Sequence, residues 1–323
     1  MKKNKWLFLA AFCCLYCFAW GIYSLLFVLT DDRTPPVITM DTELIEVSVT
    51  ADEEQLLQGI HASDNRDGDV SDLLVVENLS PLSPDFRSTV TYAAFDNTGN
   101  VARASRTLQF TDYHSPVFDL RRPLVFSSGT TPDVLGCLSA QDTIDGNISR
   151  RIKGTLVSDT SSLSYAGVHE VEFRVTNSMG DTQYITLPVD IYQVGTYNAQ
   201  VTLKDTLVRL QPGDDFDPRT YLSELLVGSL TYKLSNLNPP IVHLTREEIN
   251  ALGDDRETDV RVYINNYVNP DDNLDAYVHI VNVEMESNVN PRVPGVYSVT
   301  YTVDMDGRYT GYTRLIVIVE EQE

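Results

Sequence analysis

Three acidic residues in one short stretch have the types and spacing that could bind a metal ion. Asp64, Asp67 and Asp69 surround Gly68 in the order Asp-Asn-Arg-Asp-Gly-Asp. Ca²⁺ prefers such carboxylate oxygens and takes about six to eight oxygen ligands. The stretch is not an EF-hand loop, because Leu74 stands where that loop needs a glutamate. Since Asp and Gly also favour turns, we predict a turn here, with a weak Ca²⁺ site as the alternative and no other cofactor.

A close copy of this stretch follows 78 residues later, counted from Gly68 to Gly146. The copy keeps Asp142 and Asp145 but has Asn147 where the first stretch has Asp69. The sequence therefore indicates a repeated module, and it leaves a metal site common to both copies in doubt.

A second group of polar and aromatic side chains could bind a sugar or a peptide. They lie in and beside a polar loop between two predicted strands, where binding residues are common. The candidates are Tyr263, Asn265, Asn266, Tyr267, Asp271, Asp272 and Tyr277. The alternative is that the tyrosines are ordinary strand residues and that the loop is only solvated.

The sequence lacks the motifs of the common enzyme classes. It has no Gly-x-Ser-x-Gly elbow, no phosphate-binding Gly-x-x-x-x-Gly-Lys loop and no His-Glu-x-x-His, and its five histidines are far apart. Among the 46 Asp and Glu, no pair is singled out as the carboxylates of a glycoside hydrolase. We therefore expect a protein that is not an enzyme.

Composition and charge narrow the class of protein further. The chain has 323 residues, 42% of them hydrophobic, which suffices for two or three domains with separate cores. Its formal charge of −22 disfavours nucleic acid as a partner, because phosphates would be repelled. Outside the N-terminal apolar segment Cys137 is the one cysteine, so no disulfide framework is expected.

An uncharged apolar segment at residues 6–29 predicts a transmembrane anchor. As a helix its 24 residues would span roughly 36 Å, enough for a bilayer core of about 30 Å. Lys2, Lys3 and Lys5 place residues 1–5 in the cytoplasm, followed by a linker at 30–34 and extracellular domains. We thus expect a single-pass protein of the cell membrane. A cleaved signal peptide is the alternative, although its apolar region would be shorter.

Alternating apolar residues and glycine turns predict two β-sandwich modules, at residues 35–111 and 112–193. Each opens with a proline next to its first strand, Pro36 or Pro116, and each closes with a hairpin turn that contains Gly99 or Gly180. No helix is expected between residues 35 and 193.

Residues 194–323 end in the same closing-hairpin pattern, which predicts a third and longer module. A strand is expected over residues 197–210. The extra length lies in an insertion at about 223–290, where Thr245 and Glu248 form a capping box that predicts a two-turn helix.

These motifs together resemble a known family. The order Pro-Pro-Val-Ile, then Ala-x-Asp-x-x-Asp-Gly-Asp-Val-Ser, then Val-Thr-Tyr-x-Ala-x-Asp-x-x-Gly-Asn is similar to the bacterial Ig-like, hyalin-repeat-like tandem domains of Gram-positive surface proteins. The resemblance implies an all-β fold of tandem immunoglobulin-like β-sandwiches, here behind an N-terminal transmembrane helix. It implies a role in spacing or adhesion and no catalytic residues.

The expected function is a membrane-anchored extracellular stalk that presents its C-terminal domain at the cell surface. One alternative is a binding module that uses the insertion at 223–290 to recognise a cell-wall glycan or a surface protein. Another is an accessory subunit of a surface or export complex.

Overall fold

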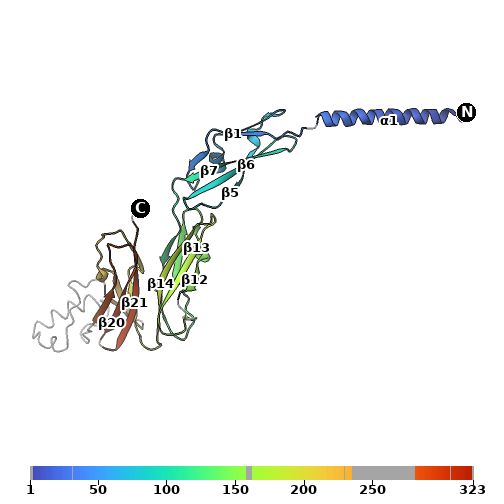
Figure 1. Cartoon of the computed structure of the whole chain (residues 1–323). Helices are drawn as coiled ribbons and strands as arrows, with labels where there is room; N and C mark the ends of the chain where they lie inside the picture. Colours follow the sequence, from blue (N-terminus) through green and yellow to red (C-terminus); the bar gives the residue numbers. More distant parts are fainter. Residues whose placement is uncertain are drawn as a thin grey trace, which may run out of the picture. The chain divides into compact units, whose positions relative to one another are not determined.

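The computed structural model describes residues 3–30, 32–157, 162–228, 230–234, 281–305 and 307–321 (Figure 1). The chain divides into two compact units, one of residues 1–114 with 178–180 and one of residues 115–177 with 181–323. The helix predicted from the capping box at Thr245 lies outside the described residues. The exact domain boundaries predicted from the sequence stay predictions.

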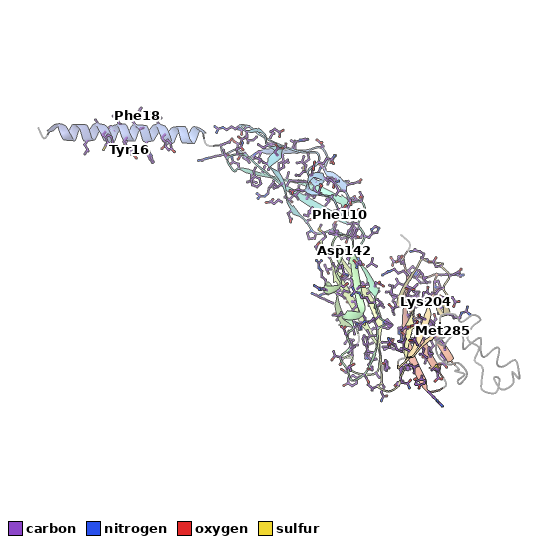
Figure 2. All side chains as sticks on the ribbon, turned by 180° about the vertical axis from the view of Figure 1, so that it is seen from behind. Tyr16, Phe18, Phe110, Asp142, Lys204 and Met285 are labelled. Carbon is purple, nitrogen blue, oxygen red and sulfur yellow. The ribbon has the colours of Figure 1, made fainter. Side chains whose placement is uncertain are left out.

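The chain begins with the helix α1, Lys3–Thr30, which is 28 residues long. Figure 2 shows the side chains of Tyr16 and Phe18 projecting from it, and both are exposed. In the part of the chain that the structure describes, no helix combines the length and the apolar character that a membrane crossing needs. The predicted segment at residues 6–29 is helical, because it lies within α1. Its assignment as a transmembrane anchor is not supported.

Two β-sheets enclose the core of the first unit. Its strands are β1 (Val37–Met40), β2 (Leu44–Val47), β3 (Ile60–Asp64), β4 (Gly68–Asp69), β5 (Leu74–Leu79), β6 (Arg87–Phe95) and β7 (Val101–Phe110). The smaller sheet has the strand order β1-β3-β4 and the larger one β2-β7-β6-β5. Strand β2 runs parallel to β7, and the other neighbours are antiparallel.

Period-two alternation along β6 explains how this core forms. Val90, Tyr92 and Ala94 are buried on one face, as the sequence predicts, and they pack with Ala62 of β3 in the other sheet. Successive side chains of a strand point to opposite faces, so a strand with this pattern is stable only when a second sheet covers its apolar side. The predicted β-sandwich is confirmed here.

The first unit also contains a short helix that the sequence analysis did not predict. Helix α2, Glu53–Leu57, begins with Asp52 as its N-cap, whose carboxylate accepts a hydrogen bond from the Gln55 amide at 2.9 Å. The Gln55 side chain accepts one from the Asp52 amide at 3.1 Å, which completes a capping box. The statement that residues 35–193 hold no helix is therefore wrong, because this box stabilises a helix too short to show a 3.6-residue period.

The second unit begins with a sandwich of the same plan. Its strands are β8 (Val117–Leu120), β9 (Val125–Ser127), β10 (Leu138–Asp142), β11 (Gly146–Asn147), β12 (Lys153–Leu156), β13 (Gly167–Thr176) and β14 (Thr182–Tyr192). The sheets have the orders β11-β10-β8 and β12-β13-β14-β9, and β9 runs parallel to β14. Short 3₁₀ turns η1 (Ser71–Leu73) and η3 (Ser149–Arg151) follow the Asp-Gly turn in each unit.

A third sandwich completes the second unit. Its strands are β15 (Gln200–Leu203), β16 (Leu207–Leu210), β17 (Leu222–Val227), β18 (Leu230–Lys233), β19 (Val281–Ser287), β20 (Gly295–Met305) and β21 (Tyr309–Val319). The sheets have the orders β15-β17-β18 and β16-β21-β20-β19, and β16 runs parallel to β21. The single strand expected over residues 197–210 is wrong, because β15 and β16 belong to different sheets.

The two sandwiches of the second unit are joined through buried contacts. The Arg314 guanidinium donates to both carboxylate oxygens of Asp190, with Nη2 at 2.7 Å from Oδ1, and Asp190 is only 5% exposed. Ile316 of β21 is packed into the core cluster that contains Phe173 of β13. The residues of one sandwich thus complete the core of the other.

Candidate metal centre

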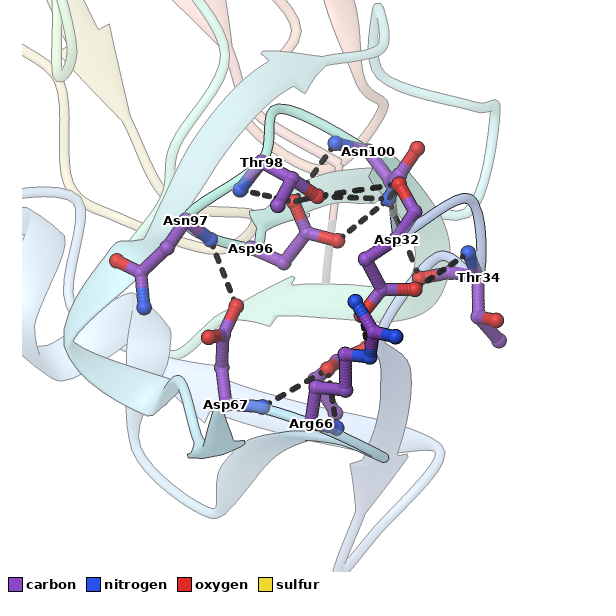
Figure 3. Close-up of polar contacts among 9 residues, drawn as sticks. Asp32, Thr34, Arg66, Asp67, Asp96, Asn97, Thr98 and Asn100 are labelled. Atoms are coloured by element: carbon purple, nitrogen blue, oxygen red, sulfur yellow. Dashed lines mark hydrogen bonds and ion pairs between the residues drawn. The ribbon is translucent and has the colours of Figure 1, made fainter. Parts of the chain in front are cut away.

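Three aspartates from separate segments of the first unit meet in one buried cluster, which we call the Asp cluster. Asp32, Asp64 and Asp96 each contribute a carboxylate oxygen, and these oxygens lie within 4.8 Å of one another. Their side chains are buried, with exposed fractions of 7%, 8% and 4%. Figure 3 shows the surroundings, with Asp32 and Asp96 close to each other and to Asn100.

Asp64 reaches the cluster from the C-terminal end of β3, where the Asp-Gly turn begins. Its Oδ1 accepts hydrogen bonds from the amides of Arg66 at 2.7 Å and Asp67 at 3.0 Å. Gly68 then adopts φ +74°, which glycine tolerates better than any other residue. The turn chemistry predicted from the sequence therefore fixes one oxygen of Asp64 and aims the other inward.

Asp96 comes from the closing turn between β6 and β7. Its Oδ1 accepts hydrogen bonds from the amides of Thr98 at 2.9 Å and Asn100 at 2.8 Å, and its Oδ2 accepts one from the Asn100 side chain at 2.7 Å. Burial alone would raise the pKa of Asp96, but these hydrogen bonds outweigh it and hold the pKa of this carboxyl below its usual value. The closing turn therefore supplies hydrogen-bond donors to both oxygens of Asp96.

Asp32 belongs to the linker that precedes β1, and the same closing turn holds it in place. Its backbone carbonyl accepts hydrogen bonds from the Asn100 side-chain amide at 3.0 Å and the Thr98 hydroxyl at 3.3 Å. Its Oδ1 accepts one from the Thr34 amide at 3.0 Å. Asn100 thus links the linker to the turn that carries Asp96.

Two oxygens of the cluster are left without a hydrogen-bond donor. Asp32 Oδ2 and Asp64 Oδ2 are buried, and neither has a donor among the residues that the structure describes. The Arg66 Nε atom lies 3.9 Å from Asp32 Oδ2, which is too long for a hydrogen bond, and the Arg66 side chain is 45% exposed. Buried carboxylates are normally paired or bound to metal, so these residues could hold a cation.

The other two residues of the predicted calcium stretch make different contacts. Asp67 Oδ2 accepts a hydrogen bond from the Asn97 amide at 2.9 Å. Asp69 is exposed, and the Ser71 hydroxyl donates to its Oδ1 at 2.6 Å, which holds the pKa of Asp69 below its usual value. Of the three predicted residues, the structure places Asp64 alone in the Asp cluster.

The residues predicted to bind a glycan or a protein lie outside the part of the chain that the structure describes. These are Tyr263, Asn265, Asn266, Tyr267, Asp271, Asp272 and Tyr277. Their role stays a prediction.

Sequence reasoning missed Asp32 and Asp96 as candidates. Asp96 could have been found, because the closing turns of the first two modules align at Gly99 and Gly180, and Asp96 of the first then stands opposite Asn177 of the second. Asp32 gives no comparable signal, since it lies in a linker whose position only the folded chain reveals.

A second candidate is a pocket on the second unit lined by cationic side chains. Arg151, Lys153, Arg174 and Thr176 line it, and Lys153 lies directly opposite Arg174 in the sheet. Arg151 already forms an ion pair with Asp145. The pocket is exposed at Lys153 and Arg174, and we assign it no ligand.

Comparison with known proteins does not identify the chain. No family model matches it. An uncharacterized 81.3 kDa protein of Acholeplasma phage L2 is 29% identical over 189 residues, which is 56% of this chain and 25% of that protein. The match thus spans about a quarter of that relative.

Solved structures that are similar to the chain include two of the cadherin type. The protocadherin GammaB4 extracellular domain is 10% identical, with 91% of this chain and 51% of that chain covered and a TM-score of 0.19. Mouse cadherin-23 EC22-24 is 11% identical, with 89% and 99% covered and a TM-score of 0.20. A CBM51-2 and INT structure from Clostridium perfringens ZmpB is 15% identical, with 52% and 31% covered and a TM-score of 0.19. At such scores, the functions of those proteins have no bearing on this chain.

Proposed function

We propose that the chain is a non-enzymatic surface protein in which tandem β-sandwiches act as a spacer. The observation that supports this most is the repetition of one strand plan. In all three sandwiches the first strand belongs to the smaller sheet, whereas the second strand belongs to the larger sheet and runs parallel to the last strand of that sheet. The parallel pairs are β2 with β7, β9 with β14 and β16 with β21. A module repeated in tandem is the kind of unit from which a spacer can be built.

The resemblance to bacterial Ig-like surface repeats agrees with this proposal, and it implies that the stalk acts at the cell surface. The proposal includes attachment to a lipid bilayer through residues 6–29, and this attachment is supported by the sequence alone. The segment carries no charge, and Lys2, Lys3 and Lys5 precede it, which favours a cytoplasmic N-terminus and extracellular sandwiches. A cell-wall glycan or a surface protein remains the expected partner of the third module.

The test is expression of the full chain, with a C-terminal epitope, in a Gram-positive bacterium. We expect the chain to stay in the membrane pellet after alkaline carbonate extraction, and protease added to intact cells to remove the epitope. The double variant Leu15→Lys and Phe18→Lys is the control, because two charges in mid-segment prevent stable insertion. Mass spectrometry of the purified chain shows whether residues 1–29 are retained.

Two results would overturn the proposal. One is release of the unmodified chain by carbonate to the same extent as the double variant. The other is an epitope that protease removes only after the cells are lysed, since the sandwiches would then be cytoplasmic.

A further inference from the structure

The two unpartnered oxygens of the Asp cluster set it apart from an ordinary acidic surface patch. Asp32 Oδ2 and Asp64 Oδ2 are buried, although one oxygen of each carboxylate is already held by backbone amides. The backbone thus fixes the orientation of both side chains, and one carboxylate oxygen of each lies within 4.8 Å of an oxygen of Asp96. A buried carboxylate oxygen in such a position is costly unless a donor or a cation faces it.

At the corresponding place in the second unit, a side-chain amide satisfies the equivalent carboxylate oxygen. Asp142 repeats the turn of Asp64, because its Oδ1 accepts hydrogen bonds from the amides of Ile144 at 3.0 Å and Asp145 at 2.7 Å. Its Oδ2 accepts a further hydrogen bond, at 3.0 Å, from the side-chain amide of Asn177, which is buried. In the first unit Asp96 stands in place of Asn177, and a carboxylate lacks the N–H donors of an amide side chain.

Arg66 forms a long ion pair with Asp32, and it is a poor substitute for a bound cation. Its Nε lies 3.9 Å from Asp32 Oδ2 and carries one positive charge against three negative ones. A divalent ion opposes more of that charge, and it can bind all three oxygens at once.

We propose that Asp32, Asp64 and Asp96 bind one calcium ion, which fastens the linker before β1 to the first sandwich. Atoms that ligate the same Ca²⁺ at about 2.4 Å can be no more than about 4.8 Å apart, and the three oxygens meet this limit. The donor set is made only of carboxylates, whereas Zn²⁺ prefers His and Cys. Mg²⁺ binds few carboxylates and keeps most of its water. Water and main-chain carbonyls would complete the coordination.

The proposal is tested on the full chain in detergent, by calorimetric titration and by thermal unfolding with EGTA, Ca²⁺ or Mg²⁺. We expect Ca²⁺ to bind with a dissociation constant of about 0.1–1 mM, the range of weak Ca²⁺ modules, and to raise the unfolding midpoint more than Mg²⁺ does. Asp64→Asn and Asp96→Asn should each weaken Ca²⁺ binding by at least about tenfold, which is about 1.4 kcal/mol. The control is Asp69→Asn, which makes the same change of charge in the same turn but outside the cluster, and it should bind as the unmodified chain does.

The behaviour in EGTA separates loss of the ion from loss of folding. Asp96→Asn recreates the pair that Asp142 and Asn177 form in the second unit, so without Ca²⁺ it should be at least as stable as the unmodified chain. With Ca²⁺ the unmodified chain should be the more stable of the two. The proposal is overturned if the unmodified chain shows no Ca²⁺-dependent shift, if Mg²⁺ stabilises it equally, or if both cluster variants keep the shift. It does not depend on membrane attachment, so the two proposals can fail separately.

Discussion

A buried carboxylate needs a partner, and Asp190 in the second unit has a guanidinium. Arg314 donates to both of its oxygens and to the Ser298 hydroxyl at 2.8 Å, so the donors that face Asp190 are fixed from several sides. Burial and the nearby Asp190 charge raise the pKa of the adjacent Tyr312 to about 12, which keeps its hydroxyl protonated as a further donor to Asp190. The two sandwiches of this unit therefore meet at a fully paired charge.

Removing Arg314 should destabilise the second unit strongly. Arg314→Met leaves the Asp190 carboxylate buried without its countercharge, and we expect the free energy of unfolding to fall by about 3–5 kcal/mol. Urea denaturation of the full chain, followed by tyrosine fluorescence, measures this loss. The matched control is Arg103→Met, because Arg103 pairs with Glu77 at the surface, where ion pairs contribute little. Equal effects of the two variants would show that the buried pair is not a structural link.

The sequence predicted Asp64 as a candidate ligand but neither Asp32 nor Asp96, because only Asp64 lies in a recognisable local motif. Asp64 stands in a turn motif that short-range rules identify. Asp32 and Asp96 are each 32 residues away along the chain, and only the pairing of β1 with β3 and the hairpin of β6 and β7 bring them close. Local chemistry can be predicted from neighbours in sequence, whereas a site assembled from three segments depends on the sheet register.

Among the elements, β21 depends on a glycine that lets β15 pass close to it. A Cβ atom at Gly311 would lie 2.7 Å from Val201 Cγ2 and 3.0 Å from the Ala199 carbonyl oxygen. The Val201 side chain would have to move, since real Cβ contacts are essentially never that short, and the Ala199 backbone would have to shift by a few tenths of an ångström. The alternating residues of β21 predict that it is a long strand. They do not predict the glycine at position 311, which is required by the close approach of β15.

Gly311→Ala should therefore lower the free energy of unfolding by about 1–3 kcal/mol, because overpacking forces a backbone shift. Gly154→Ala is the comparison, since its Cβ would meet side chains and no backbone atom, with the Phe173 ring at 3.2 Å and Val171 Cγ1 at 3.5 Å. We expect the Gly311 variant to have the lower unfolding midpoint in circular dichroism. If Gly154→Ala were the more harmful change, the close approach of β15 to β21 would be contradicted.

The strands themselves were predictable where one face alternates cleanly. Val90, Tyr92 and Ala94 of β6, like Val171, Phe173 and Val175 of β13, are buried as period two requires. The break between β15 and β16 was not predictable in the same way. Both pieces are apolar, and what separates them is that each joins a different sheet, which is a property of the whole sandwich.

For the whole molecule, the division into two compact units with separate cores predicts two unfolding transitions. One core contains Tyr92 and Leu108 and belongs entirely to the first unit, while Phe173 and Ile316 share another in the second. The Asp cluster lies in the first unit and the Asp190–Arg314 pair in the second. Changes at these two places should therefore act on different transitions.

Differential scanning calorimetry of the full chain can assign the two transitions by such changes. Ca²⁺ should raise the midpoint of one transition, and Asp64→Asn should abolish that rise, because a ligand stabilises the unit that binds it. Arg314→Met should lower the midpoint of the other transition and leave the Ca²⁺-sensitive one in place. A single transition that responds to both variants would mean that the chain unfolds as one cooperative unit. A substitution at either site would then lower the free energy of unfolding of the whole chain.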